Sequence, residues 1–132
     1  RWDALGPDGT IYDPDMNSYN HYAYGAVCQW LFEGVAGLRP DPDRPGFEGL
    51  LLDPVIIPAL SPVAAQHDSP KGPLSAGWRI EGGRVRYSVT LPEGTTARFE
   101  PRGRRGLTVN GTAPAGAVEI GAGRHEISFD VT

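Results

Sequence analysis

The sequence predicts a mainly β protein, an antiparallel β-sandwich preceded by one long amphipathic α-helix. Up to about residue 40, a single stretch has apolar residues three and four positions apart, which is the spacing of one helix face. From Phe47 onward, apolar residues alternate with polar ones in short runs separated by glycine-containing turns. Short strands that follow one another without helices between them favour an antiparallel sandwich over a parallel sheet.

The helix is expected over Ser18–Leu38. Its apolar stripe consists of Ala23, Ala26, Val27, Trp30, Leu31, Val35 and Leu38. Asn17 or Ser18 can accept hydrogen bonds from the first free amides, and Gly37 can supply the left-handed residue beyond the last turn. Cys28 lies inside the apolar pattern, so we expect it to be a small hydrophobic core residue.

Eight strands are expected after the helix. They are Gly49–Ile56, Val63–His67, Leu74–Glu81, Arg84–Leu91, Thr95–Pro101, Leu107–Val109, Ala117–Ile120 and Arg124–Val131. The alternation is clearest in the fourth, where every second residue from Val85 to Leu91 is apolar. Gly82-Gly83 and Asn110-Gly111 stand between expected strands, and such pairs close two-residue hairpins because they tolerate positive φ.

The helical and the alternating pattern meet at a linker rich in proline and aspartate, Asp41–Gly46. We therefore expect residues 1–46 to form one part, a loop and the helix, and residues 47–132 to form the sandwich domain. Because the helix stripe is wide and has no second helix beside it in the sequence, three arrangements are open. The helix docks on the sandwich, self-associates with another copy, or is covered by upstream residues.

Composition excludes several classes of function. The net charge of −4 lacks the basic face that nucleic acids or an anionic membrane require. No apolar run approaches the ~20 residues of a membrane span. His21, His67 and His125 do not have zinc-ligand spacing, and the single cysteine adds no partner, so no metal or other cofactor is expected.

The candidate binding residues gather where the expected helix begins, in Ser18-Tyr19-Asn20-His21-Tyr22-Ala23-Tyr24-Gly25. Imidazole and amide groups hydrogen-bond hydroxyls, and aromatic faces cover the apolar side of a pyranose, so this mixture suits a carbohydrate site. A helix N-terminus with a tyrosine-rich core explains the same residues. The residue types alone leave both interpretations open.

A resemblance favours the sugar site. The chain resembles the C-terminal end of bacterial α-L-rhamnosidases in residue order and spacing, although beyond about Pro92 only in composition and strand rhythm. The segments that carry the resemblance are Arg1-Trp2-Asp3, Met16–Gly25, Trp30–Phe32, Ala36–Leu38, and Asp68–Gly72 through Trp78.

The resemblance implies that the chain is a C-terminal fragment of an inverting glycoside hydrolase that removes terminal α-L-rhamnose. The helix would be among the last of an (α/α)6 barrel, and the sandwich would cover the barrel surface. His21 matches the family histidine that hydrogen-bonds rhamnose, whereas Trp2, Asn20 and Tyr24 match motif neighbours without an assigned role. In the family, the general base is a glutamate directly before Arg-Trp-Asp and the general acid lies far upstream. No catalytic residue is therefore expected here, and the fragment should be inactive alone.

Two other function classes are open. A carbohydrate-binding module would need an exposed aromatic platform, for which Trp78, Tyr87 and Phe99 are candidates, although two of them sit in alternating patterns that favour burial. A non-enzymatic adhesion or interaction domain is the other, because sandwiches serve many functions. The arginines of the last third are expected to form a solvated strand edge rather than a nucleic-acid site. These are Arg98, Arg102, Arg104 and Arg105.

Overall fold

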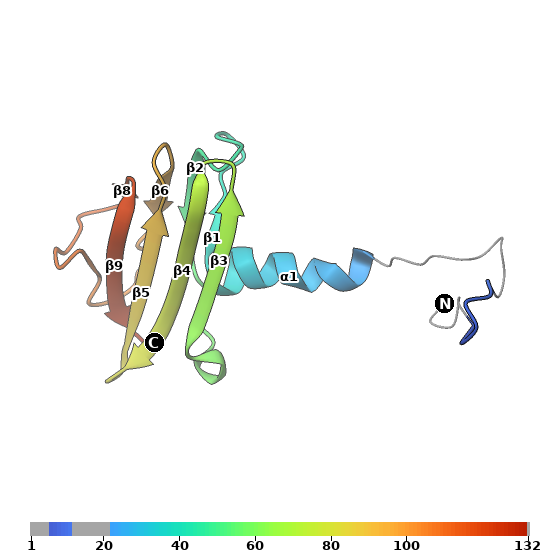
Figure 1. Ribbon diagram of the computed structural model, residues 1–132. Helices are drawn as coiled ribbons and strands as arrows, with labels where there is room; N and C mark the ends of the chain where they lie inside the picture. The colour runs from blue at the N-terminus through green and yellow to red at the C-terminus, as the bar shows by residue number, and fades with distance from the viewer. Residues whose placement is uncertain (1–5, 12–21, 132) are drawn as a thin grey trace.

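The computed structural model describes residues 6–11 and 22–131. Two β-sheets lie face to face, and a helical segment projects from one side of them (Figure 1). One sheet has four strands in the order β1-β2-β6-β8, and the other has five in the order β3-β4-β5-β9-β7. The predicted mainly β fold, a sandwich preceded by one helix, is therefore confirmed.

The helical segment covers residues 22–35 and changes geometry twice. It consists of a 3₁₀ turn η1 (Tyr22–Gly25), the α-helix α1 (Ala26–Trp30) and a π turn η2 (Leu31–Val35). The predicted start at Ser18 lies outside the described residues. The predicted end at Leu38 is wrong, because Gly37 takes a φ of 74° and turns the chain into the first strand. Gly37 thus has the role that the sequence predicted for it.

The four-stranded sheet contains one parallel pair. Its strands are β1 (Leu38–Pro40), β2 (Gly49–Leu52), β6 (Thr96–Phe99) and β8 (Val118–Ile120). β1 pairs with β2 and β8 with β6 in antiparallel fashion, but β2 runs parallel to β6, with Gly49 opposite Thr96. The purely antiparallel prediction is wrong for this pair, because alternation along one strand does not encode the direction of a partner distant in sequence. β2 also ends earlier than predicted, since Pro54 soon follows and cannot donate to a ladder.

The five-stranded sheet is antiparallel throughout. Its strands are β3 (Val63–Ser69), β4 (Gly72–Glu81), β5 (Arg84–Leu91), β9 (Gly123–Asp130) and β7 (Thr108–Val109). A 3₁₀ turn, η3 (Pro58–Leu60), precedes β3. The predicted Gly82-Gly83 hairpin between β4 and β5 is confirmed, with positive φ at both glycines. Asn110 and Gly111 also take positive φ and close a tight turn with a Val109–Thr112 bridge, but they do not join a strand pair, because β7 pairs with β9 and β8 lies in the other sheet.

The hydrophobic core lies between the two sheets and receives every second residue of the central strands. Its largest fully buried apolar side chains are Trp78, Tyr87, Phe99, Leu50, Leu52, Leu74, Ile127, Val85 and Val89. Burying each of these contributes about 1.5–3 kcal/mol relative to exposure, so this layer is the main source of stability.

β1 lies before the expected domain boundary at residue 46, yet it belongs to the sandwich. The turn between β1 and β2 is closed by backbone hydrogen bonds from the Asp41 amide to the Gly49 carbonyl and from the Gly49 amide to the Arg44 carbonyl, of 3.0 and 3.1 Å. The division into residues 1–46 and 47–132 stays a prediction.

Candidate functional site

The predicted sugar-contacting histidine, His21, lies outside the described residues, as do Trp2 and Asn20. Tyr24 lies in η1. The contact between His21 and a sugar stays a prediction. What the structure does describe is the helical segment that directly follows His21 and the way in which the sandwich holds its other end.

The last carbonyls of the helical segment are bound by donors from the sandwich. The Val55 amide donates to the Gly34 carbonyl at 2.9 Å. The Trp78 indole Nε1–H donates to the Val35 carbonyl at 2.7 Å, and the Tyr87 hydroxyl donates to the Ala36 carbonyl at 3.0 Å. A helix end leaves such carbonyls without intrahelical partners, and these three bonds satisfy them. We call this arrangement the helix–sandwich joint.

Trp78 and Tyr87 belong to the core, on neighbouring strands β4 and β5, where they face each other in register. Their polar atoms bond the helical segment, as is typical of buried tryptophan and tyrosine, whose N–H and O–H need a partner. Burial raises the pKa of the Tyr87 phenol far above its usual value, so the hydroxyl stays protonated and remains a donor. Because all three candidates for an aromatic platform, Trp78, Tyr87 and Phe99, are buried, a carbohydrate-binding surface built on them is excluded.

Gly37 allows the joint to close. Its φ of 74° is unfavourable for residues with a side chain. A Cβ at this position would also lie 2.6 Å from the backbone nitrogen of Pro54. The segment that carries Val55 can therefore approach the helix end only where there is no side chain.

Arg104 stabilises the chain segment that leads into the joint. Its Nη2 donates to the Asp53 carboxylate at 2.9 Å, and its Nη1 donates to the Glu100 carbonyl at 3.1 Å. The guanidinium carbon also lies 5.2 and 5.0 Å from the ring centroids of Phe99 and Phe129, within cation–π range. These contacts hold the chain just before Val55 in place.

Arg98, Arg102 and Arg105 are exposed, as expected, but they do not form a strand edge: Arg98 lies in β6, which pairs with β2 and β8, and Arg102 and Arg105 lie in the loop after β6. The expected exposure is wrong for Arg104, whose side chain is only 16% exposed, compared with 57% for Arg102. The cause is local, because Asp53 pairs with both arginines and draws Arg104 over the two phenylalanine rings.

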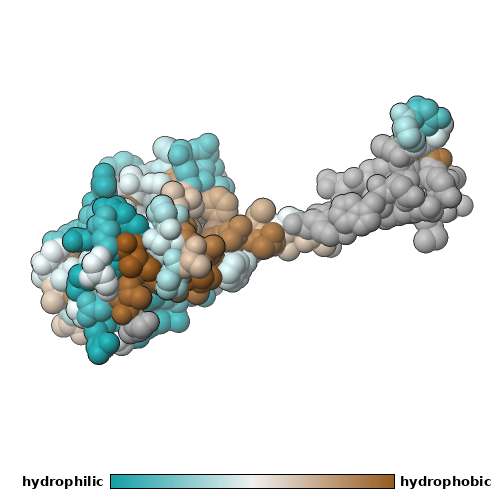
Figure 2. All heavy atoms as spheres, turned by 90° about the horizontal axis from the view of Figure 1, so that it is seen from below, coloured by the Kyte–Doolittle hydropathy of each residue, from teal (hydrophilic) through white to brown (hydrophobic). Residues whose placement is uncertain are grey.

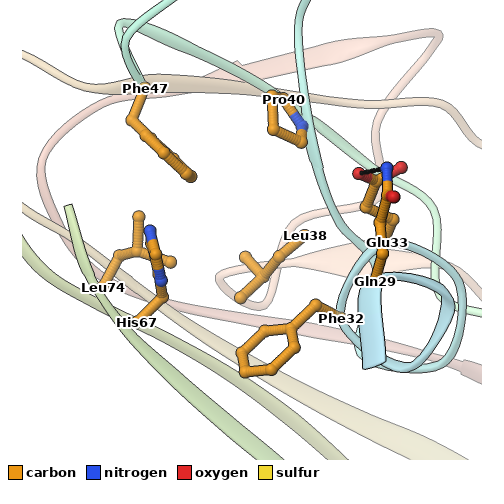
Figure 3. A pocket seen from close by; sticks show the side chains of 8 residues that line it. All are labelled: Gln29, Phe32, Glu33, Leu38, Pro40, Phe47, His67 and Leu74. Carbon is orange, nitrogen blue, oxygen red and sulfur yellow. Dashed lines mark hydrogen bonds between the residues drawn. The ribbon is translucent and has the colours of Figure 1, made fainter. Parts of the chain in front are cut away.

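A pocket of about 210 Å³ lies beside the joint, between the helical segment and the sheets (Figure 3). The rings of Phe32, His67 and Phe47 line it, with centroids 6.4 Å apart for Phe32–His67 and 4.7 Å apart for Phe47–His67. On the helix side, Gln29 donates to Glu33 at 2.8 Å. The lining is mainly apolar, with Gln29 and Glu33 bonded to each other and the His67 imidazole as the remaining polar group.

The outer part of the helical segment is not covered by the sandwich. Val27 and Trp30 are 55% and 49% exposed, and Leu31 and Phe32 are also exposed. Figure 2 shows hydrophobic residues along the projecting segment where it leaves the sandwich. Docking of the helix on the sandwich, one of the three expectations, therefore holds for Val35 and Leu38 at its end and not for the outer part from Val27 to Leu31. Cys28 is exposed as well, which contradicts its expected core position, because among the described residues no element packs over this part of the segment.

Residues 6–11 and 22–131 contain no group of three His, Cys, Asp or Glu side chains that could hold a metal ion. Within the same residues, no helix is long and apolar enough to cross a membrane.

The fold defines a two-sheet β-sandwich domain that binds the end of a projecting helical segment. Comparison with known proteins agrees. The family described as "Bacterial alpha-L-rhamnosidase C-terminal domain" matches residues 37–112. The chain belongs to this family.

The relatives of the chain are much longer. An α-L-rhamnosidase of Streptomyces avermitilis is 30% identical over 97% of this chain, which covers 13% of that protein. An α-L-rhamnosidase of an Alteromonas species is 31% identical over 76% of this chain and 11% of that protein. The chain thus spans about an eighth of the length of the curated relatives it matches.

Solved structures of α-L-rhamnosidases also match nearly the whole of this chain and are several times longer. The crystal structure of the S. avermitilis α-L-rhamnosidase complexed with L-rhamnose superposes with a TM-score of 0.68, 29% identity, and coverage of 98% of this chain and 13% of the other. A native α-L-rhamnosidase from Aspergillus terreus gives a TM-score of 0.65 and 30% identity over 98% of this chain and 14% of the other. The likeness therefore includes the helical segment as well as the sandwich.

Sequence reasoning placed Trp78 and Tyr87 correctly in the core but missed their role in the joint. A usable signal was present, because a buried indole N–H or phenol O–H needs a hydrogen-bond partner. The last carbonyls of a helix have no intrahelical donor, so they are suitable acceptors for such a group. The roles of Asp53 and Arg104 had no comparable signal, since they depend on how the two sheets meet.

Proposed function

We propose that the full-length protein containing this chain is an inverting glycoside hydrolase that removes terminal α-L-rhamnose from rhamnosides. The observation that carries the proposal is the 30% identity to the S. avermitilis α-L-rhamnosidase over 97% of the chain. A match to the sandwich alone would indicate only a shared accessory domain. The match across nearly the whole chain supports a shared catalytic unit upstream.

In this proposal residues 1–46 contribute the end of the catalytic (α/α)6 barrel and, through β1, the first strand of the sandwich, and residues 47–132 form the rest of the sandwich domain that supports the barrel. The exposed stripe around Val27 and Trp30 supports the assignment, because a helix of such a barrel buries that face against its neighbours. The upstream barrel is then the main partner of this chain.

His21 is the residue of this chain proposed to contact the rhamnose ring. It directly precedes the helical segment, whose described part begins at Tyr22. An imidazole at a helix entrance can present a nitrogen to a sugar hydroxyl. The two catalytic carboxylates belong to residues outside this chain, so its own contribution is binding and support.

The test compares the full-length reading frame with this chain. Purified full-length protein should release rhamnose from an aryl α-L-rhamnoside, and NMR of the first product should show inversion at the anomeric carbon. The isolated chain should show no turnover in the same assay. Turnover by the isolated chain, or none by a folded full-length protein, would overturn the proposal.

A further inference from the structure

The helical segment has two faces with different surroundings. Phe32 lines the pocket beside the joint, where its ring lies against His67 of β3 (Figure 3). Val27, Trp30 and Leu31 lie three and four positions apart, as the residues of one helix face do, and all three are exposed. Among the described residues, the sandwich therefore covers the first face of the segment and leaves the second face open.

The open face continues onto the sandwich at Val55. The Trp30 indole lies over Gly34, where a Cβ would be only 3.0 Å from the indole Nε1. The Gly34 carbonyl accepts the hydrogen bond from the Val55 amide, so Val55 stands next to the residue that Trp30 covers. Because Val55 is itself exposed, the apolar surface extends from the segment to the sandwich. We call Val27, Trp30, Leu31 and Val55 the apolar patch.

The sandwich side of the apolar patch has a charged border. Asp53 lies two residues before Val55 and pairs at 2.9 Å with Arg102, which stands in solvent. An apolar centre with a charged, solvated rim is the usual anatomy of a surface that binds another polypeptide. Leu60 is also exposed, but it lies outside this arrangement, because the next residue, Ser61, bonds to β4 rather than to the helical segment.

The polypeptide that precedes this chain in the full-length protein is the partner that fits the apolar patch. The chain covers 13% of the S. avermitilis relative and belongs to a family of C-terminal domains, so in such relatives most of the protein comes before this part. The helical segment connects to that part through its outer end. Upstream residues are therefore tethered near the patch at a high effective concentration, whereas a second copy must reach it by collision.

We propose that one apolar surface of the upstream polypeptide packs on the helical segment and on the sandwich together, with Val55 as the contribution of the sandwich. The inference rests on the proposed function only in that a catalytic unit precedes this chain. It goes beyond burial of the helix stripe, because it makes the sandwich a direct contact of that unit. The helix–sandwich joint then holds the two halves of one binding surface in a fixed relation.

Cysteine labelling of the folded full-length protein tests this contact. Val55→Cys and Leu60→Cys, each in a Cys28→Ser background, are compared for their rate of reaction with a maleimide, and mass spectrometry identifies the labelled peptide. Val55 is 48% and Leu60 43% exposed in this structure, so without a partner both cysteines should react alike. With the upstream partner in place, Val55→Cys should react at least about tenfold more slowly, because the reaction requires access to the thiol. Equal rates would overturn the inference.

A photo-crosslink identifies what covers Val55. A diazirine-bearing amino acid in place of Val55 should, on illumination of the full-length protein, form a crosslink to a peptide that precedes Arg1 in the same molecule. A crosslinked product with the mass of two molecules, or a crosslink confined to residues 1–132, would overturn the inference. Slow labelling of Val55→Cys in a folded protein that releases no rhamnose would support the interface and overturn the proposed function alone, so the two can fail separately.

Discussion

At the scale of single residues, Arg102 and Arg104 show how burial decides what an ion pair contributes. Both guanidinium groups lie 2.9 Å from the Asp53 carboxylate. Arg104 is largely enclosed and covers two phenylalanine rings, whereas Arg102 stands in solvent. Water screens the exposed Arg102–Asp53 pair, so it contributes little to the free energy of unfolding. Loss of the largely buried Arg104 costs more, because it leaves the partly buried Asp53 carboxylate without its enclosed counter-charge.

We expect Arg104→Met to lower the free energy of unfolding by about 2 kcal/mol, through loss of the partly buried pair and of the cation–π contacts. Arg102→Met is the matched control and should cost about 0.5 kcal/mol, because its pair with the same carboxylate is exposed. Urea unfolding of both variants, at equal m values, measures the difference. Equal losses would show that burial does not distinguish the two arginines.

His21→Ala tests the proposed sugar contact. In the full-length enzyme it should lower kcat/KM by an amount equivalent to about 1.5–3 kcal/mol, the range for a lost hydrogen bond that involves a charged group. Its unfolding temperature should hardly change. Kinetics like those of the unchanged enzyme, combined with a large loss of stability, would instead assign a structural role to His21.

At the scale of elements, the strands could be predicted well because alternation and turn residues are local signals. β5 has the predicted bounds, Arg84–Leu91, and the Gly82-Gly83 turn before it forms as expected. The partners of β2 could not be predicted, because its pairing with β6 depends on how the whole sandwich is assembled. The helix end was predicted at Leu38 on periodicity alone, but the left-handed Gly37 moves that residue into β1.

Less of the candidate site could be predicted than of the fold. The sequence motif identified His21, which no contact among the described residues tests. The joint depends on side chains and carbonyls far apart in sequence, such as Tyr87 and Ala36, so no local pattern contains it.

Gly37→Ala tests the element boundary. It should lower the free energy of unfolding by about 2–3 kcal/mol, because about 1–2 kcal/mol of left-handed strain adds to the contact of the new Cβ with Pro54. Gly46→Ala is the control, with a similar φ of 71° but no atom within 4 Å of its Cβ. It should show the strain alone. Chemical denaturation of the two variants separates the backbone strain from the contact with Pro54. Equal losses of unfolding free energy in both variants would mean that Pro54 moves aside without cost.

At the scale of the whole molecule, the chain combines a buried sandwich core with an apolar helical segment whose outer part the sandwich does not cover. Each large side chain left in water forgoes about 1.5–3 kcal/mol of burial. Exposed apolar patches of this kind are typical of surfaces that bind another protein. In the full-length protein the upstream barrel is the proposed partner, and in the isolated chain a second copy can take its place.

The isolated chain should therefore self-associate through this stripe. Its apparent mass by light scattering should increase with concentration, and Trp30→Glu should abolish the increase, because burying an unpaired charge opposes association. Leu60→Glu adds the same charge at another exposed apolar site, 43% exposed in η3, and should leave association unchanged. A strictly monomeric chain at all concentrations would contradict the prediction.

The parallel pairing of β2 with β6 also bears on how the protein forms during synthesis. The Thr95 hydroxyl bonds the Phe47 carbonyl across 48 residues, which a ribosome takes about 2–10 s to add. During most of that interval β2 has been synthesised but its partner β6 has not, and Trp78 and Tyr87, which bind the helix end, are also made within it. A polypeptide released before Phe99 would therefore expose an unpaired strand, so premature termination in this stretch should direct the nascent chain to aggregation or proteolysis rather than to a shortened but folded product.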